Sequence, residues 1–151
     1  MSKEPIIIVG GEPNSIFLEI FFKSLKAKTY KSPLIIVISK KLLQEQMKKL
    51  SFTFEINDID KKLKDFTKLN NNKINLINVD YDFKKCFEKI TSKSNKYINE
   101  TFETALNFMK KNNFSKLING PVSKKYFLKG KTLGITEYLA NKTKRSKVAM
   151  L

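Results

Sequence analysis

The stretch PIIIVGGEPNSIFLEIFFKSLKAKTYKSPLIIVIS, residues 5–39, decides the fold class of this chain. It begins and ends with nearly continuous runs of β-branched residues, 5–10 and 33–39, which are typical of strands covered on both faces of a parallel sheet. Between these runs, apolar residues recur at helical spacing, notably Ile16, Ile20 and Leu25. A strand, a helix and a strand in this order predict a βαβ unit.

Helical and strand patterns continue to alternate beyond this unit. We expect helices at residues 40–50 and 94–113, the second being the clearer because apolar residues recur there every three or four positions. We expect further strands at residues 52–56, 73–79, 115–119 and 147–151, with 73–79 at the sheet edge. Residues 57–72 fit either a short helix or polar turns. Together these patterns predict a single domain over residues 1–151, a layered α/β/α fold with a mostly parallel sheet.

The composition limits the partners that the protein can have. The net charge of +16 is compatible with nucleic-acid binding. However, Arg145 is the one arginine among thirty basic residues, and the lysines are spread along the whole chain, a pattern also typical of a genome poor in G and C. Nucleic-acid recognition favours the planar, bidentate group of arginine, so we expect no nucleic-acid partner. No apolar run approaches the length needed to cross a bilayer, and we expect a cytoplasmic protein without a membrane partner.

The absence of histidine excludes several kinds of active site. A Ser-His-Asp triad, a histidine general base and any zinc site with a histidine ligand are all impossible within this sequence. Cys86 is the single cysteine, so it cannot form an internal disulfide, and we interpret it as a buried or half-buried thiol.

The glycines fall in two regions far apart in the sequence, and each region follows a predicted strand. Gly10 and Gly11 precede candidate helix N-caps at Asn14 and Ser15, and the amides of a helix N-terminus can bind an anion. In the second region, NGPVSK at residues 119–124, proline suits the first turn of a following helix, which would contain Lys124. Ligands of parallel sheets bind at the carboxyl ends of strands, so both regions could line one cleft. On spacing alone, an ordinary tight turn and a solvated lysine are the simpler explanation of the same residues.

Three short motifs, GEPNSIFLE, NGPVSK and GITEYLA, resemble in order and separation the N-terminal half of the 4-hydroxythreonine-4-phosphate dehydrogenase family. The residues that match the family patterns are Gly11, Glu12, Pro13, Ile16 and Glu19 in the first, Gly120, Pro121 and Lys124 in the second, and Gly134, Thr136, Glu137 and Tyr138 in the third. Ile135 stands where the family has a histidine, and isoleucine cannot donate a hydrogen bond.

The resemblance implies a fold like that of isocitrate and isopropylmalate dehydrogenases, with this chain as the N-terminal part of a longer, two-domain, homodimeric enzyme. That enzyme would oxidise 4-phosphooxy-L-threonine with NAD, and the β-keto acid formed would lose carbon dioxide, in pyridoxal phosphate biosynthesis. A divalent metal would be held by ligands outside this chain. Residues that would contact the phosphorylated substrate are Thr136, Ile135 and Lys124. Candidate loop or anion-binding residues are Gly11, Glu12, Asn14, Ser15, Gly120, Pro121 and Glu137, and no residue is assigned a catalytic role.

Two other functions fit the same residues. Because Ile135 replaces the family histidine, a related dehydrogenase could act on a different hydroxy acid. Because metal ligands are missing from this sequence, a catalytically inactive, dehydrogenase-like binding module is also compatible with it.

Overall fold

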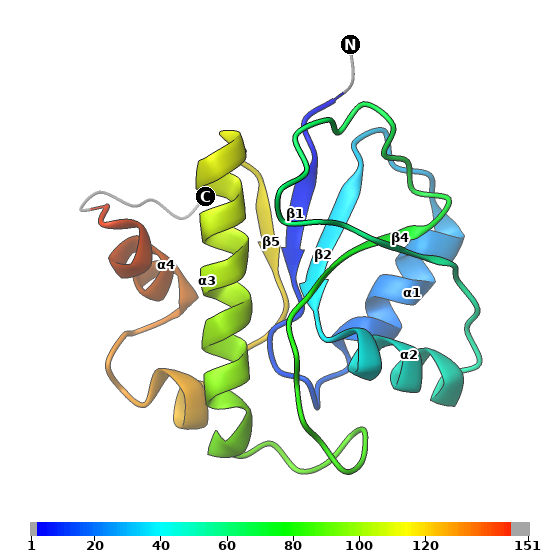
Figure 1. Cartoon of the computed structure of the whole chain (residues 1–151). Helices are drawn as coiled ribbons and strands as arrows, with labels where there is room; N and C mark the ends of the chain where they lie inside the picture. The colour runs from blue at the N-terminus through cyan, green and yellow to red at the C-terminus, as the bar shows by residue number, and fades with distance from the viewer. Residues whose placement is uncertain (1–2, 146–151) are drawn as a thin grey trace.

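The computed structural model describes residues 3–145, and its centre is a parallel sheet of five strands (Figure 1). The strands are β1 (Ile6–Val9), β2 (Leu34–Ile38), β3 (Ile56–Asp58), β4 (Ile74–Asn78) and β5 (Leu117–Asn119), in the spatial order β3-β4-β2-β1-β5. Every pairing between neighbours is parallel. The layered α/β fold that the sequence predicts is confirmed.

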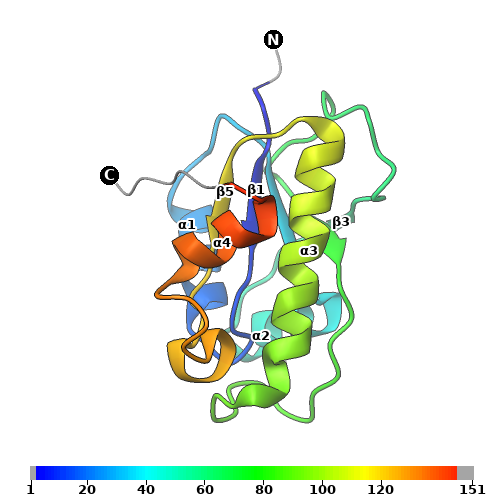
Figure 2. The same ribbon diagram turned by 90° about the vertical axis from the view of Figure 1, so that its left-hand side faces the viewer.

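Helices cover both faces of the sheet. Helices α1 (Phe17–Ala27) and α2 (Lys40–Lys49) contact each other, while α3 (Asn95–Asn112) packs on β1 and β2. Figure 2 shows α1 and α3 on opposite sides of β1 and β5. The connections through α1 and α2 lead across the sheet in the direction of β3, whereas the connection through α3 leads in the opposite direction, from β4 to β5. Because connections between parallel strands are right-handed, α3 lies on the face of the sheet opposite to α1 and α2. β1 and β2 are thereby buried from both sides, which is why their sequences are apolar without alternation.

The structure differs from the sequence predictions at three elements. The helix α1 begins at Phe17 after Ile16, so neither Asn14 nor Ser15 holds the N-cap position, although the Ser15 hydroxyl accepts a hydrogen bond from the Phe17 N–H at 3.3 Å. The preceding residues form a turn closed by the Ser15 N–H, which donates to the Glu12 carbonyl at 3.1 Å. The strand expected at residues 52–56 is wrong except at Ile56. Its phenylalanines, Phe52 and Phe54, instead pack their rings against Phe22.

Strand β4 lies inside the sheet, so the prediction that residues 73–79 form an edge strand is wrong. Its Asn75 is only 2% exposed. The Asn75 side chain is nevertheless satisfied, because Asn57 donates to its oxygen at 3.0 Å and its amide donates to the Leu34 carbonyl at 3.0 Å. Hydrogen bonding of this kind allows a polar side chain to be buried between strands. The strand predicted at residues 147–151 lies outside the described residues.

The chain after β5 packs against α3. A short π-helical turn, η2 (Lys124–Leu128), begins three residues after Pro121, which therefore precedes the helical turn expected to contain it. It is followed by α4 (Ile135–Thr143). Phe127 of η2 stacks on Phe102 of α3, and Tyr138 of α4 meets the same ring edge to face. None of the helices that the structure describes is both long and apolar enough to span a membrane. Cys86 is a free, buried thiol, as expected.

Candidate functional site

The two glycine regions meet at the carboxyl ends of β1 and β5. The Gly120 N–H donates to the Val9 carbonyl at 2.7 Å, and the Glu12 N–H donates to the Pro121 carbonyl at 2.8 Å. A Cβ on Gly120 would lie 2.1 Å from the Gly10 oxygen, and one on Gly11 would lie 2.4 Å from the Pro121 oxygen. Glycine is required here because two backbones approach closely, and the left-handed φ of +71° at Gly11 adds a second reason.

This meeting point is where crossovers leave the sheet toward opposite faces. The chain after β1 turns toward α1, while the chain after β5 turns toward α3 through η2, whose Tyr126 carbonyl accepts a hydrogen bond from Asn95 at 2.7 Å. Open α/β sheets bind ligands outside the carboxyl ends of the strands at such a switch point. The prediction that both regions lie along the same edge of the sheet is confirmed.

Glu12 is buried at this edge, with 3% of its surface exposed. Its Oε1 accepts a hydrogen bond from the Asn14 N–H at 3.2 Å, and its Oε2 accepts one from the Ser94 hydroxyl at 3.0 Å. No lysine or arginine among residues 3–145 forms an ion pair with it. The Glu12 side chain thus connects the first glycine turn to the start of α3, while the side chain of Asn14 accepts from the Glu88 N–H at 3.0 Å.

Two stacked tyrosines, Tyr81 and Tyr97 of α3, lie near the carboxyl ends of the strands. The rings of Tyr81 and Tyr97 are 4.3 Å apart, and the Tyr97 oxygen accepts a hydrogen bond from the Ser39 N–H at 2.9 Å. Burial raises the pKa of Tyr97 far above its ordinary value, and the nearby Glu12 charge acts in the same direction. Burial and the same carboxylate also raise the pKa of Tyr81. Both phenols therefore remain protonated and neutral over the physiological range.

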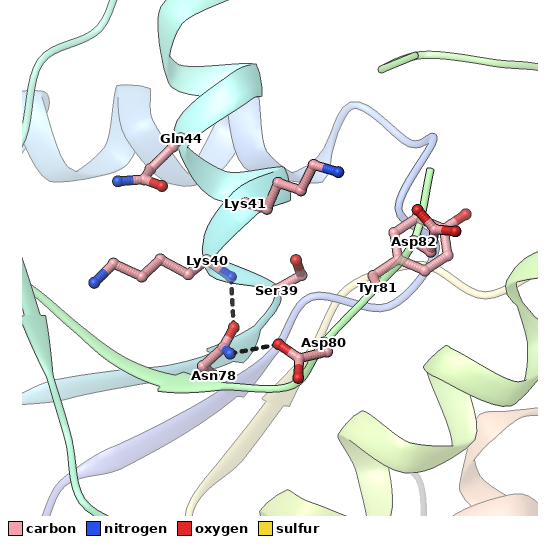
Figure 3. Close-up of a pocket in the computed structure, with 8 residues that line it drawn as sticks. All are labelled: Ser39, Lys40, Lys41, Gln44, Asn78, Asp80, Tyr81 and Asp82. Atoms are coloured by element: carbon pink, nitrogen blue, oxygen red, sulfur yellow. Dashed lines mark hydrogen bonds between the residues drawn. The ribbon is translucent and has the colours of Figure 1, made fainter. Parts of the chain in front are cut away.

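A cavity of about 410 Å³ opens at the carboxyl ends of β2 and β4 (Figure 3). Figure 3 shows its two lysines, Lys40 and Lys41, extending in opposite directions. Lys40 forms an ion pair with Asp58 at 2.5 Å, and its backbone N–H donates to the Asn78 side chain at 2.8 Å. Lys41 lies over the Phe83 ring at 5.1 Å. The sequence analysis missed this cavity, although charged residues follow two predicted strands, and ligands bind where parallel strands end.

Lys124 is exposed and is the first residue of η2, as predicted for the first turn of a helix after Pro121. The turn is capped by Ser123, whose hydroxyl accepts from the Tyr126 N–H at 3.1 Å. Within the described part of the chain no carboxylate pairs with the Lys124 ammonium group. Its charge is therefore free to meet an anion.

Ile135, Thr136 and Glu137 form the first turn of α4 and are partly buried. Ile135 packs against the hydrophobic core. The helix is held on α3 by the Tyr138 hydroxyl, which donates to Asn99 at 2.9 Å, and by an ion pair of Lys142 with Glu103 at 2.7 Å. Figure 1 shows α4 beside α3, away from the lower ends of the strands where the glycine turns meet. The residues predicted to bind the substrate or an anion thus form two groups, one at the carboxyl edge of the sheet and one on α4.

The residues that the structure describes do not fit a metal site. Among residues 3–145 no group of three or more His, Cys, Asp or Glu side chains is placed to hold a metal ion. The turn after β1 also lacks the G-x-G-x-x-G pattern of a classical dinucleotide site.

Comparisons with known proteins identify relatives of this fold. The family model described as "Pyridoxal phosphate biosynthetic protein PdxA" matches residues 29–151. The structure is similar to that of 4-hydroxythreonine-4-phosphate dehydrogenase from Burkholderia phymatum, with a TM-score of 0.77 and 18% identity over 97% of this chain and 46% of that one. It is also similar to the Klebsiella pneumoniae enzyme of the same name, with a TM-score of 0.75 and 20% identity over 94% of this chain and 45% of that one. The chain thus spans less than half the length of these enzymes. A comparison with curated proteins gives no match.

Proposed function

The chain belongs to the PdxA family of pyridoxal phosphate biosynthetic proteins, and from this membership we propose that it is the N-terminal part of an NAD-dependent 4-hydroxythreonine-4-phosphate dehydrogenase. The whole enzyme would oxidise the secondary alcohol of 4-phosphooxy-L-threonine to a ketone, passing a hydride to NAD and releasing a proton. The resulting β-keto acid then loses carbon dioxide. We propose a homodimer of two-domain subunits, located in the cytoplasm, without a nucleic-acid or membrane partner.

The family membership carries this proposal, and the position of Lys124 supports the part that concerns substrate binding. An exposed ammonium group without a carboxylate partner, at the start of a turn beside the sheet's carboxyl edge, is suited to an anionic substrate. Thr136, in the first turn of α4, would supply a hydroxyl group to the same substrate. Gly11, Glu12, Gly120 and Pro121 would act indirectly, by fixing the loop positions.

Metal binding is assigned to a part of the enzyme beyond this chain. Since residues 3–145 hold no suitable metal cluster, a metal ion would be coordinated by residues of the other half. The contribution of the present chain is to bind and orient the substrate.

The test is NADH formation by the protein from the complete reading frame, given NAD and 4-phosphooxy-L-threonine. A hydrogen bond to a charged group is worth about 1.5–3 kcal/mol, so Lys124→Ala should lower kcat/KM roughly tenfold to a hundredfold. Lys125→Ala is the matched control, because Lys125 is the adjacent exposed lysine of the same turn and lies over the Tyr126 ring at 5.2 Å. Equal activity of the two variants would remove Lys124 from the substrate site.

Ile135 favours a second candidate, a dehydrogenase acting on another hydroxy acid. Its side chain packs against the core and offers no hydrogen bond, so the site has one donor fewer than the family pattern. Comparing turnover of phosphorylated and unphosphorylated hydroxythreonine distinguishes the two enzymes, and Ile135→His should favour the phosphorylated substrate. A complete protein that binds the substrate but forms no NADH would instead be the inactive binding module.

A further inference from the structure

The start of α3 is hydrogen-bonded to both of the loops that follow β1 and β5. Ser94, which precedes the helix, donates its hydroxyl to the Glu12 carboxylate of the first loop at 3.0 Å. Asn95, the first residue of the helix, donates its side-chain amide to the Tyr126 carbonyl of η2 at 2.7 Å. Two adjacent residues therefore fix the two loops relative to each other, although the loops are far apart in the sequence.

The Tyr126 carbonyl needs a donor from outside its own turn. η2 has five residues, and the last carbonyls of a helical segment have no partner within it. The segment ends at Lys129, whose left-handed φ of 50° stops the helical path. Among residues 3–145 no backbone N–H donates to the Tyr126 carbonyl, and the amide of Asn95 does. A carbonyl that is withdrawn from water without a donor is unfavourable, so this amide keeps the turn in its observed place.

The same hydrogen bond controls the direction of the turn that carries Lys124. The end of η2 is anchored by apolar contacts, because Leu128 is buried and the Phe127 ring stacks on a ring of α3 at 6.3 Å. These contacts lie at the opposite end of the turn from Lys124, whose side chain is exposed. The hydrogen bond at Tyr126, two residues after Lys124, therefore limits rotation of the turn about its apolar anchor.

We propose that Asn95 is a positioning residue for substrate binding. Its amide would hold η2 in the orientation that presents the Lys124 ammonium group to an anionic group of the substrate. Asn95 does not touch the substrate and acts through Lys124, so the inference rests on the proposed function. The other polar atom of this side chain, Oδ1, is shielded and makes no hydrogen bond within the described chain. Replacing Asn95 therefore tests the amide bond to η2 alone.

The experiment measures the affinity of the complete protein for 4-phosphooxy-L-threonine by calorimetric titration, in a double-mutant cycle. Asn95→Leu keeps the size of the side chain and its lack of charge but removes the donor. We expect it to weaken binding by about threefold to tenfold, less than Lys124→Ala does, because the lysine is displaced and not lost. In the Lys124→Ala background, Asn95→Leu should have no further effect, because the two residues act through one contact.

Asn112→Leu is the matched control. Asn112 also belongs to α3, and its amide also donates to a backbone carbonyl, that of Phe108 at 2.9 Å, but it lies at the other end of the helix. Its replacement should leave the substrate affinity unchanged, even where it lowers the stability of the protein. Asn95→Ala repeats the test without adding bulk, and circular dichroism verifies that each variant has the native fold. In steady-state assays, both Asn95 variants should raise KM with kcat nearly unchanged, because binding and not chemistry is affected.

Three results would overturn the role of Asn95. They are unchanged affinity in both Asn95 variants, an equal loss of affinity from Asn95→Leu with Lys124 present or replaced, and an equal loss in Asn112→Leu, which would reduce the effect to the stability of α3. Each of them leaves the proposed function intact as long as the unsubstituted protein forms NADH. A complete protein that does not bind 4-phosphooxy-L-threonine would instead refute the proposed function, and the role of Asn95 with it.

Discussion

Alanine at position 120 would place a methyl group where the second glycine turn already contacts the first. Its Cβ would lie 2.1 Å from the Gly10 oxygen and 2.8 Å from the Gly10 carbonyl carbon, while the Phe17 ring is 3.0 Å away. The atoms in the way are mainly backbone, so no side-chain rotation relieves the clash. The turns must separate, which stretches the hydrogen bonds from the Gly120 N–H to Val9 and from the Glu12 N–H to Pro121.

The expected loss of stability follows from these two effects. Forcing extra atoms into a packed site costs about 1–3 kcal/mol, and two weakened hydrogen bonds of about 0.5–1.5 kcal/mol each add to it. We therefore expect Gly120→Ala to lower the free energy of unfolding by about 2–6 kcal/mol. Substitutions at two other glycines distinguish the cost of steric overlap from the cost of a left-handed backbone conformation.

Gly130→Ala tests backbone conformation alone, because its φ is +69° but no atom lies within 4 Å of an added Cβ. A left-handed conformation costs a residue with a side chain about 1–2 kcal/mol, and that is the expected loss. Gly11→Ala combines a φ of +71° with a 2.4 Å contact and should be the most destabilising of the three. Urea unfolding of the complete protein, followed by circular dichroism, measures the series. If Gly120→Ala costs no more than Gly130→Ala, the two turns are not packed as described.

Two further predictions concern buried polar groups. Burial, followed by the Glu103 charge, raises the pKa of Tyr138 to about 12, so the folded protein holds this proton more tightly than the unfolded chain. The associated stability is complete below the ordinary tyrosine pKa of about 10 and is lost as the pH rises through the folded value. Tyr138→Phe should flatten this alkaline decline in urea unfolding, and an unchanged decline would contradict it. Asn75→Ala leaves the Leu34 and Asn70 carbonyls without their side-chain donor, so it should lower the free energy of unfolding by about 2–4 kcal/mol. The control Asn72→Ala, at an exposed residue, should lower it by less than about 0.5 kcal/mol. Thermal unfolding of both variants measures the difference.

The sequence predicted the sheet's central strands and its main helices because their apolar patterns are long and regular. β1, β2, α2 and α3 all appear close to the expected residues. The sequence predictions failed where side chains pack against residues distant in sequence, because no local pattern shows such contacts. Phe52 and Phe54 look like strand residues but pack on Phe22. Residues 73–79 were expected at the sheet edge, but Asn75 is buried there by partners from other segments.

The candidate site was predictable to the extent that it depends on backbone turns. Glycines after strands identified both loops, and the rule for parallel sheets put them along the same edge. The cavity lined by Lys40 and Asn78, and the hydrogen bond from Asn95 to Tyr126, depend on segments that are distant in sequence. Spacing within a motif carries no information about such contacts.

The closeness of the two turns also limits what they can do for a ligand. Gly11 and Gly120 are directed at each other's backbones, and the Glu12 N–H is already bonded to the Pro121 carbonyl. The Glu12 and Gly120 N–H groups, already bonded to the Pro121 and Val9 carbonyls, are therefore not free to donate to a substrate. The close contact of the two turns instead fixes the separation of the loops that follow β1 and β5. Of the predicted residues beside the sheet edge, Lys124 is the one with a positively charged side chain, and it is exposed and forms no ion pair within the described chain. Substrate affinity should therefore respond directly to Lys124, and to the glycines only through the stability of the turns.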